Sequence, residues 1–171
     1  MPKVCDNTSV AILVWRDSKL LMIERKKYNF GFAVPAGHQD GLDPVQTANS
    51  ELGEEIGLTP DALEQKLELA LPNTCKRDGG THHLWTVFEA TTWHGEIKPS
   101  QDETKSFIWA DREALLKMVA VLEEFSKRKG IALDTAHVAE LQRATNEDKS
   151  WIAQPGLEPP MFFLFKRLGI I

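Results

Sequence analysis

Three glutamates crowd one short stretch of the chain: Glu51, Glu54 and Glu55. At about 100° of rotation per residue, they would share an arc about 100° wide on a helix. Like charges four residues apart destabilise a helix by about 0.2–0.5 kcal/mol, and no basic residue lies one turn away to offset the repulsion. Carboxylate oxygens are the ligands that Mg²⁺ and Mn²⁺ prefer, with positions left for water and phosphate. The cluster predicts a divalent-cation site, and a solvated acidic helix face is the alternative.

A glycine-containing loop directly precedes the glutamates. Its residues 35–41 are Pro-Ala-Gly-His-Gln-Asp-Gly, and the glycines allow a close approach of the backbone to a ligand or metal. Asp43 followed by Pro44 predicts the start of a helix, and Gly57 predicts its end. We expect the apolar positions of the helix at 44–56 to form a buried stripe, made of Val45, Ala48, Leu52 and Ile56.

The segment 37–58 resembles the Nudix box of the Nudix hydrolases, which is Gly, five residues, Glu, seven residues, then Arg-Glu-apolar-x-Glu-Glu-x-Gly-apolar. The second half of that pattern is matched here by Glu51, Leu52, Glu54, Glu55, Gly57 and Leu58. Gly37 and Asp43 fit the first half, with Asp in place of Glu. Two features depart from the pattern, because the spacer 44–49 is one residue short and Ser50 replaces the family's arginine. In the family that arginine helps to hold a glutamate in place by charge pairing.

The resemblance implies a metal-dependent hydrolase that cleaves the pyrophosphate linkage of a nucleoside diphosphate linked to another group. Mg²⁺ or Mn²⁺ would be held by Glu51, Glu54, Glu55 and the carbonyl of Gly37. Glu54 is the first candidate for the base that takes a proton from the attacking water, and Glu103 is the second. Bound cations would also reconcile an anionic small-molecule substrate with the chain's net charge of −5.

Two further residues are candidates for substrate binding. Arg25 follows a predicted strand and could meet substrate phosphates, and His38 lies inside the glycine-containing loop. A solvated turn and a loop-stabilising hydrogen bond are the respective alternatives. His82 and His83 are consecutive strand residues whose side chains point to opposite faces, and with Cys75 they lack the spacing of a zinc site. We therefore expect no zinc.

Two other functions compete with hydrolysis. Ser50 motivates a catalytically impaired Nudix-fold module that binds nucleotides without turnover. Isoprenyl diphosphate isomerases form one branch of the fold, and they have a Cys-bearing motif upstream of the box, whereas Cys75 lies downstream. The sequence does not select among nucleoside triphosphates, nucleotide sugars, dinucleoside polyphosphates and pterin triphosphates.

The elements around the box predict an α+β fold. Strands are expected at 8–15, 20–25, 30–34, 67–71, 82–91 and 106–110, with residues 36–42 as a loop. Further helices are expected between the caps Asp111 and Gly130 and from Asp134 to about Lys149. The resemblance spans about residues 8–125 and implies a Nudix-type α/β/α sandwich with a mixed β-sheet. We expect a Nudix hydrolase domain at 1–130 and an added C-terminal helical extension at 131–171, packed on the same domain.

The apolar segment Met161–Phe165 is predicted to pack back on the body of the protein. An exposed partner-binding patch is the alternative. The tail that contains it could cap the site or form the seam of a homodimer.

Charge and composition exclude several classes of protein. The 20 Lys+Arg against 25 Asp+Glu argue against general nucleic-acid binding, which needs a basic face. The longest apolar run, Val10–Trp15, is too short to span a membrane. Residues 1–7 lack the apolar core of a signal peptide, and two cysteines are too few for a disulfide framework. We therefore expect a cytoplasmic protein that is not bound to a membrane.

Overall fold

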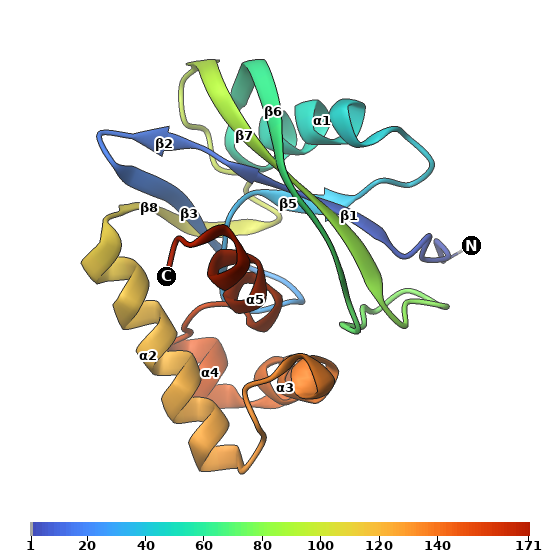
Figure 1. The fold of residues 1–171 in the computed structure, drawn as a ribbon, viewed down its shortest axis with the longest axis vertical. Helices are drawn as coiled ribbons and strands as arrows, with labels where there is room; N and C mark the ends of the chain where they lie inside the picture. The colour runs from blue at the N-terminus through green and yellow to red at the C-terminus, as the bar shows by residue number, and fades with distance from the viewer. Residues whose placement is uncertain (1) are drawn as a thin grey trace.

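The computed structural model describes residues 2–171 and shows an α+β fold built on two sheets (Figure 1). The first sheet has the strand order β5-β1-β7-β6, formed by Ala36–His38 (β5), Thr8–Leu13 (β1), His83–Gly95 (β7) and Leu58–Leu71 (β6). Strands β1 and β7 are parallel and the other neighbours antiparallel, so the sheet is mixed. The second sheet contains Trp15–Arg16 (β2), Lys19–Arg25 (β3) and Phe32–Ala33 (β4), and Thr104–Ala110 (β8) pairs with β3.

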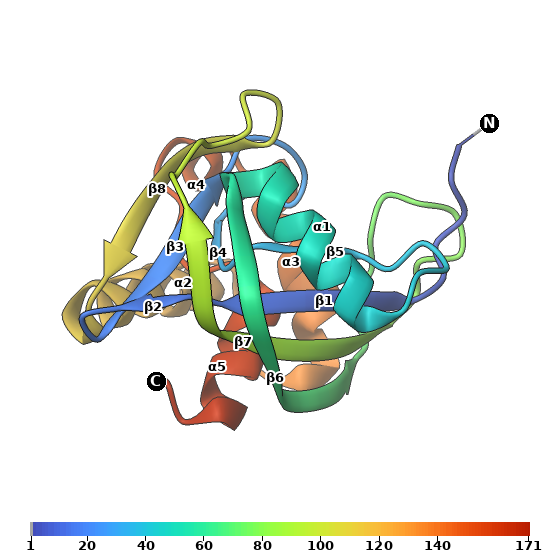
Figure 2. The same cartoon turned by 90° about the horizontal axis from the view of Figure 1, so that it is seen from above.

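Helices cover both sides of these sheets (Figures 1 and 2). Helix α1 (Pro44–Ile56) lies on one side. The other side carries α2 (Arg112–Lys129), a 3₁₀ turn at Thr135–His137, α3 (Val138–Glu147), α4 (Lys149–Ala153) and α5 (Pro159–Leu168). The three layers are the predicted α/β/α sandwich. Within residues 2–171, no helix combines the length and the apolar character that crossing a membrane requires.

Strand β1 accounts for the three layers because its two faces enter different cores. Val10 and Ile12 pack in the apolar cluster with α1. Ala11 and Leu13 pack in the cluster with α2, α4 and α5. Successive side chains of a strand point to opposite faces, so an almost wholly apolar strand must be covered on both.

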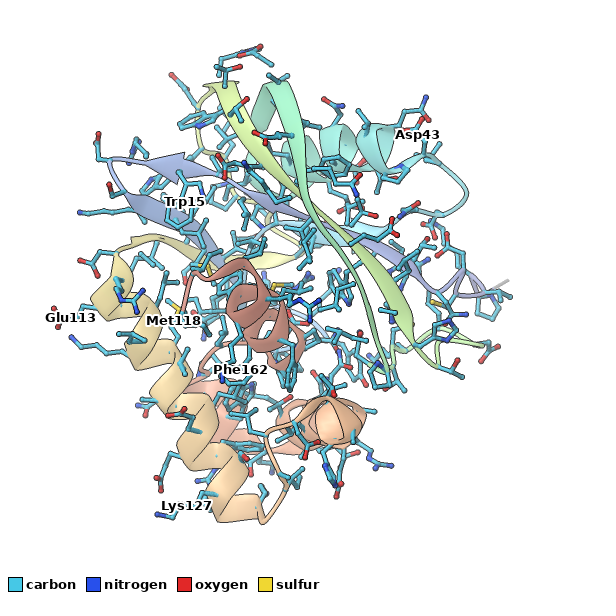
Figure 3. All side chains as sticks on the ribbon, viewed as in Figure 1. Trp15, Asp43, Glu113, Met118, Lys127 and Phe162 are labelled. Atoms are coloured by element: carbon cyan, nitrogen blue, oxygen red, sulfur yellow. The ribbon has the colours of Figure 1, made fainter. Side chains whose placement is uncertain are left out.

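The C-terminal segment packs onto the body, as predicted. Met161, Leu164 and Phe165 are at most 1% exposed, and the segment forms half of helix α5. Phe162 joins the same apolar cluster as Met118 of α2, and Figure 3 shows both side chains in the layer below the sheets. The alternative of an exposed partner-binding patch is excluded.

Helix α1 has the predicted boundaries. The Gln46 N–H donates to the Asp43 side chain at 2.9 Å, and Gly57 ends the helix in the left-handed region with φ of 79°. One predicted core residue is wrong, because Val45 is 48% exposed. The buried stripe instead runs through Thr47, Ala48, Leu52, Glu55 and Ile56, which leaves Val45 on the solvent side of the first turn.

Four elements differ from the prediction. The predicted strand 8–15 is interrupted at Val14. Residues 36–38 of the predicted loop form β5, because β1 offers them backbone partners. Strand β6 starts at Leu58 rather than at 67, since it lies at the edge of its sheet, where Pro60 and exposed polar residues are tolerated. The helix predicted to reach about Lys149 ends at Glu147.

Candidate active site

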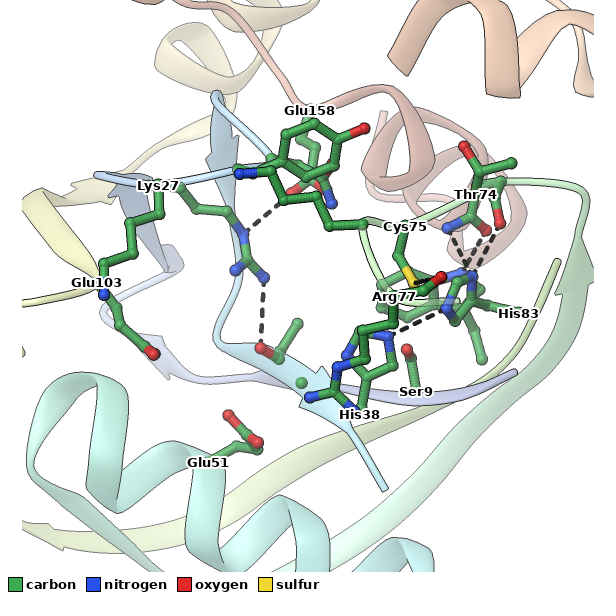
Figure 4. A pocket seen from close by; sticks show the side chains of 18 of the residues that line it. Ser9, Lys27, His38, Glu51, Thr74, Cys75, Arg77, His83, Glu103 and Glu158 are labelled. Carbon is green, nitrogen blue, oxygen red and sulfur yellow. Dashed lines mark hydrogen bonds and ion pairs between the residues drawn. The ribbon is translucent and has the colours of Figure 1, made fainter. Parts of the chain in front are cut away.

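The box residues converge on a cavity of about 280 Å³ beside α1 and β5 (Figure 4). Gly37, Glu51, Glu55 and Glu103 all line it. The Glu51 carboxyl group occupies the space that a Cβ atom on residue 37 would need. Glycine at this position therefore lets a carboxylate lie directly against the backbone. A site that uses a backbone carbonyl and a carboxylate as ligands requires such a contact.

Glu54 lies differently from the other box glutamates. It is exposed and does not line the cavity, although its charge helps to raise the pKa of Glu51. The structure thus brings three of the four predicted metal-binding residues to the cavity, together with Glu103, while Glu54 lies beside Glu51 at the surface of the helix.

The environment of these acids fits a divalent cation. Burial, together with repulsion from Glu54, raises the pKa of Glu51 to about 7. Burial raises the pKa of Glu55 to about 8, even though Arg25 opposes the shift. Crowded and partly desolvated carboxylates are costly as anions unless a positive charge compensates them. Hard oxygen donors in this arrangement suit Mg²⁺ or Mn²⁺.

Arg25 pairs with two buried glutamates from distant parts of the chain. Its Nη1 lies 3.6 Å from Glu55 Oε1, its Nε lies 3.2 Å from Glu158 Oε2, and its Nη2 donates to the Ala36 carbonyl at 3.3 Å. Burial would lower the pKa of Arg25, but the charges of Glu158 and Glu55 outweigh it and raise that pKa. Ser50, at the box position of the family's arginine, is exposed. Arg25 therefore supplies the charge that holds Glu55.

Basic side chains line the same cavity: Lys27, Lys76 and Arg77. The Lys76 Nζ lies 5.0 Å from the centre of the Tyr28 ring, and Arg77 forms an ion pair with Asp40. Cationic side chains next to acids that suit a divalent cation also suit a phosphate ligand. Sequence reasoning overlooked Lys76 and Arg77, although two adjacent basic residues in a glycine-containing loop were a usable signal.

The two predicted substrate-binding residues, Arg25 and His38, both line the cavity. Burial, with Arg77 and His83 nearby, lowers the pKa of His38 to about 4, so its imidazole is neutral at pH 7. Sequence reasoning also missed Glu158, which directly precedes α5 and is 2% exposed. No local motif around it pointed to the site.

Comparisons with known proteins identify the family and the fold. A family profile described as the NUDIX domain matches residues 6–130 of the 171. No curated protein matches the chain. A similar solved structure is the MutT NUDIX hydrolase from Burkholderia pseudomallei, with a TM-score of 0.54 and 22% identity. That match covers 63% of this chain and 84% of the other.

Two further solved structures extend over more of the chain. The NUDIX domain of Shewanella oneidensis NrtR, complexed with ADP ribose, has a TM-score of 0.52 and 16% identity, covering 84% of this chain and 88% of that domain's chain. The MutT protein from Methanosarcina mazei Go1 has a TM-score of 0.55 and 16% identity, covering 87% and 99%. At these identities the neighbours establish the fold. Because the NUDIX profile covers well over half of the residues, the chain belongs to the Nudix hydrolase family, a family of pyrophosphohydrolases.

Proposed function

We propose that this chain hydrolyses the pyrophosphate linkage of a nucleoside diphosphate linked to a second group, with Mg²⁺ or Mn²⁺ as its cofactor. One observation carries the proposal: the carboxylates of Glu51, Glu55 and Glu103 share a cavity with the cationic side chains of Lys76 and Arg77. Cation-binding acids and phosphate-binding bases in one cavity are the two groups of side chains that metal-assisted pyrophosphate cleavage requires.

The metal-binding roles follow the box. The carbonyl of Gly37 and the carboxylates of Glu51, Glu54 and Glu55 would hold the cation. When bound, the cation screens the charge of the pyrophosphate and polarises its phosphorus–oxygen bonds. Arg25 keeps Glu55 oriented through their ion pair, and the hydrogen bond from the Ala36 N–H to Glu55 Oε2, 2.9 Å long, fixes the same carboxyl group.

A carboxylate takes the proton from the attacking water in this proposal. Glu54 is the first candidate because its exposed side chain can reach a water next to Glu51, and Glu103 is the second because it lines the cavity. Arg25 and His38 are proposed to contact substrate phosphates, although two glutamates already engage the Arg25 guanidinium.

The NrtR domain that resembles this chain was solved with ADP ribose, which is a nucleoside diphosphate joined to a second group. This supports ADP ribose and nucleotide sugars as the first compounds to assay. Nucleoside triphosphates, dinucleoside polyphosphates and pterin triphosphates complete the panel. Each would be incubated with Mg²⁺, with Mn²⁺ and with a chelator, and the products would be identified.

We expect turnover of at least one compound that stops when the cation is removed. Glu55→Gln should weaken cation binding, and either Glu54→Gln or Glu103→Gln should lower turnover about 100-fold or more, as loss of a general base does. Glu64→Gln is the matched control, since Glu64 is exposed on β6 and pairs with Lys66. Tight nucleotide binding without turnover of any compound would contradict the proposal and favour the impaired binding module.

A further inference from the structure

Four soft donor atoms meet at the end of the cavity away from the glutamates. They belong to two cysteines and two histidines, and they lie within 4.8 Å of one another: Cys5, His38, Cys75 and His83. The chain has no other cysteine. Figure 4 shows the side chains of His38, Cys75 and His83 gathered at one end of the cavity, with Glu51 and Glu103 toward the other. This cluster shares no residue with the proposed carboxylate ligands.

Two of the distances between donor atoms are close to those of a tetrahedral metal site. His38 Nε2 and His83 Nε2 are 3.3 Å apart, and Cys5 Sγ lies 3.3 Å from His83 Nε2. Bonds of about 2.0–2.1 Å from zinc to nitrogen, at tetrahedral angles, separate two nitrogens by about 3.3 Å. With bonds of about 2.3 Å from zinc to sulfur, a sulfur and a nitrogen are about 3.5 Å apart. The cluster needs only small adjustments to bind an ion.

The orientation of His83 favours ligation through Nε2. Its Nδ1 lies 2.8 Å from the backbone carbonyl of Asn73 and 3.2 Å from the Asn73 side-chain nitrogen, and the shorter contact to the carbonyl favours a proton on Nδ1. The side-chain oxygen of Asn73 in turn accepts from the Trp85 indole at 3.0 Å. Metal-binding histidines usually have such a partner on the second ring nitrogen. The unprotonated Nε2 faces both Cys5 and His38. Its one lone pair cannot serve both neighbours, whereas a single cation can bind Nε2 and both neighbouring donor atoms at once.

The surrounding backbone keeps this space for the four side chains. Cys5 is 5% exposed and His83 is 1% exposed. The Cys5 N–H donates to the Asp78 carbonyl at 2.8 Å, and the Cys75 N–H donates to the Gly80 carbonyl at 3.3 Å. A Cβ on Gly80 would overlap the sulfur of Cys75. The segment before β1 and the β6–β7 loop are thereby joined around the cluster.

We propose that this chain binds one structural Zn²⁺ ion through two thiolates and two imidazoles, those of Cys5, His38, Cys75 and His83. Thiolate and imidazole ligands select zinc over the hard cations that carboxylates bind. Four protein ligands close the coordination sphere, so the ion stabilises structure and does not activate water. The proposal does not rest on the hydrolytic activity proposed above.

The position of the site gives it a role at the cavity wall. His38 directly follows Gly37 of the box, and Cys75 directly precedes Lys76 and Arg77. A bound ion would connect the segment at Gly37 and His38 to the loop that carries these basic side chains. With zinc bound, His38 would shape the wall through its Nε2, so the phosphate contact proposed for it above applies to the zinc-free protein.

The spacing argument against zinc considered only ligands close together in the sequence, so it did not address a cluster of this kind. The four ligands come from separate segments, so no short motif marks them. The argument about the consecutive histidines holds, since His83 is buried in the cluster whereas His82 is exposed and its ring lies 3.0 Å from the Thr81 hydroxyl.

The test is the zinc content of the purified full-length chain. The protein would be stripped with a chelator under reducing conditions, exposed to an equimolar amount of Zn²⁺, dialysed and measured by elemental mass spectrometry. We expect about one zinc per chain and a higher Tm for the zinc-loaded protein, since an ion that binds only the folded state stabilises it. Co²⁺ in place of Zn²⁺ should give visible bands of tetrahedral geometry and a thiolate charge-transfer band.

Neighbouring histidines provide the matched variants. His83→Gln and Cys75→Ser should lose the bound zinc, and their cobalt thiolate band should be lost or weakened. His82→Gln should keep the zinc and the band. Circular dichroism checks that each variant folds, and the wild-type zinc and cobalt measurements test the proposal even if a variant does not. Wild-type protein without bound zinc, zinc loss in His82→Gln equal to that in His83→Gln, or a Cys5–Cys75 disulfide in the isolated protein would overturn it.

Discussion

At the residue scale, the end of the cavity that carries the glutamates depends on the absence of a side chain at position 37. The Glu51 carboxyl group fills the volume that a Cβ there would need. Since Glu51 belongs to α1 and Gly37 to β5, this contact also sets how closely the helix and the strand approach at the cavity. Even alanine would push the carboxyl group away from the backbone.

We expect Gly37→Ala to lower turnover about 100-fold, because a shift of about 1 Å in a positioned group has an effect of that size. The fold should persist, as judged by circular dichroism. Gly53→Ala is the control from the same box, because its Cβ would meet only the Leu58 carbonyl, at 3.9 Å. Steady-state turnover rates of the two variants and the wild type would be compared on the panel compound that is hydrolysed fastest. Full activity in Gly37→Ala would mean that the position of Glu51 does not matter.

The Arg25 ion pairs make a second prediction at this scale. The Arg25 side chain is 19% exposed, and those of Glu55 and Glu158 are 2% exposed. Arg25→Met should lower the free energy of unfolding by about 3–5 kcal/mol, because it leaves buried carboxylates without their counter-charge. Adding Glu158→Gln should recover part of that loss.

Urea unfolding of the wild type, the two single variants and the double variant completes the cycle. Independent, additive losses would show that Arg25 and Glu158 do not stabilise each other. In that case the guanidinium would be available for the substrate contact proposed for it.

At the element scale, Asp148 separates α3 from α4 close to the predicted end of the helix at about Lys149. Its carboxylate accepts from the Trp151 N–H at 3.0 Å, so it caps α4, and it lies 2.7 Å from the Lys129 Nζ of α2. The turn lets Trp151 pack on Phe125, with ring centroids 5.0 Å apart. The sequence pattern predicted the end of the first helix at about Lys149 but did not predict the short helix α4 that follows.

We expect Asp148→Asn to lower Tm at pH 7, with the difference from wild type vanishing in acid. Hydrogen bonds from Lys129 and Ser150 hold the pKa of Asp148 below its usual range. A lowered pKa in the folded state stabilises the protein above the unfolded pKa of about 3.9, and this stability is lost as the pH falls below it. Asparagine keeps the cap, so the variant removes mainly the charge.

Thermal melts from pH 7 down to acid would measure this dependence. Lys129→Gln should show the same loss at neutral pH and the same convergence in acid. A Tm difference that stays constant over the pH range would contradict the role of the Asp148–Lys129 pair.

At the scale of the whole molecule, the tail beyond the matched NUDIX domain completes the cavity. The Phe32 N–H donates to the Gly156 carbonyl at 2.8 Å, and the Glu158 N–H donates to the Phe32 carbonyl at 2.9 Å. The Leu157 N–H donates to the Met118 carbonyl of α2 at 3.0 Å. This extended segment bridges β4 and α2, and it brings Glu158 to Arg25.

We expect Gly156→Ala to destabilise the protein by about 1–3 kcal/mol, as overpacking does. A Cβ on Gly156 would lie 2.6 Å from the Met118 carbonyl oxygen and 2.8 Å from Val121 Cβ. The same substitution at Gly53, inside α1 and in open space, should instead stabilise the protein by about 0.5–1 kcal/mol. Urea midpoints compare the two. A Gly156→Ala variant as stable as the wild type would show that the tail can move away from α2 freely.

Much of the fold was predictable where the signal is local. The cap at Asp43, the proline after it and Gly57 defined α1 because capping and backbone preferences act within a few residues. Strand β6 was underestimated because its edge position, which tolerates Pro60 and exposed polar residues, is a property of the assembled sheet. Val45 was misplaced because the direction of the buried stripe depends on the sheet against which α1 packs.

The box helix, its acids and the continuous apolar run that buries β1 on both faces can all be predicted from the sequence, since each follows from neighbours along the chain. Only the folded chain brings Arg25 to Glu55, adds Glu158 from the tail, and places two cysteines beside two histidines. Cys5 and His83, for example, are 78 positions apart. Contacts of this kind depend on how the sheets and loops fold back on one another, so they cannot be predicted from spacing along the chain.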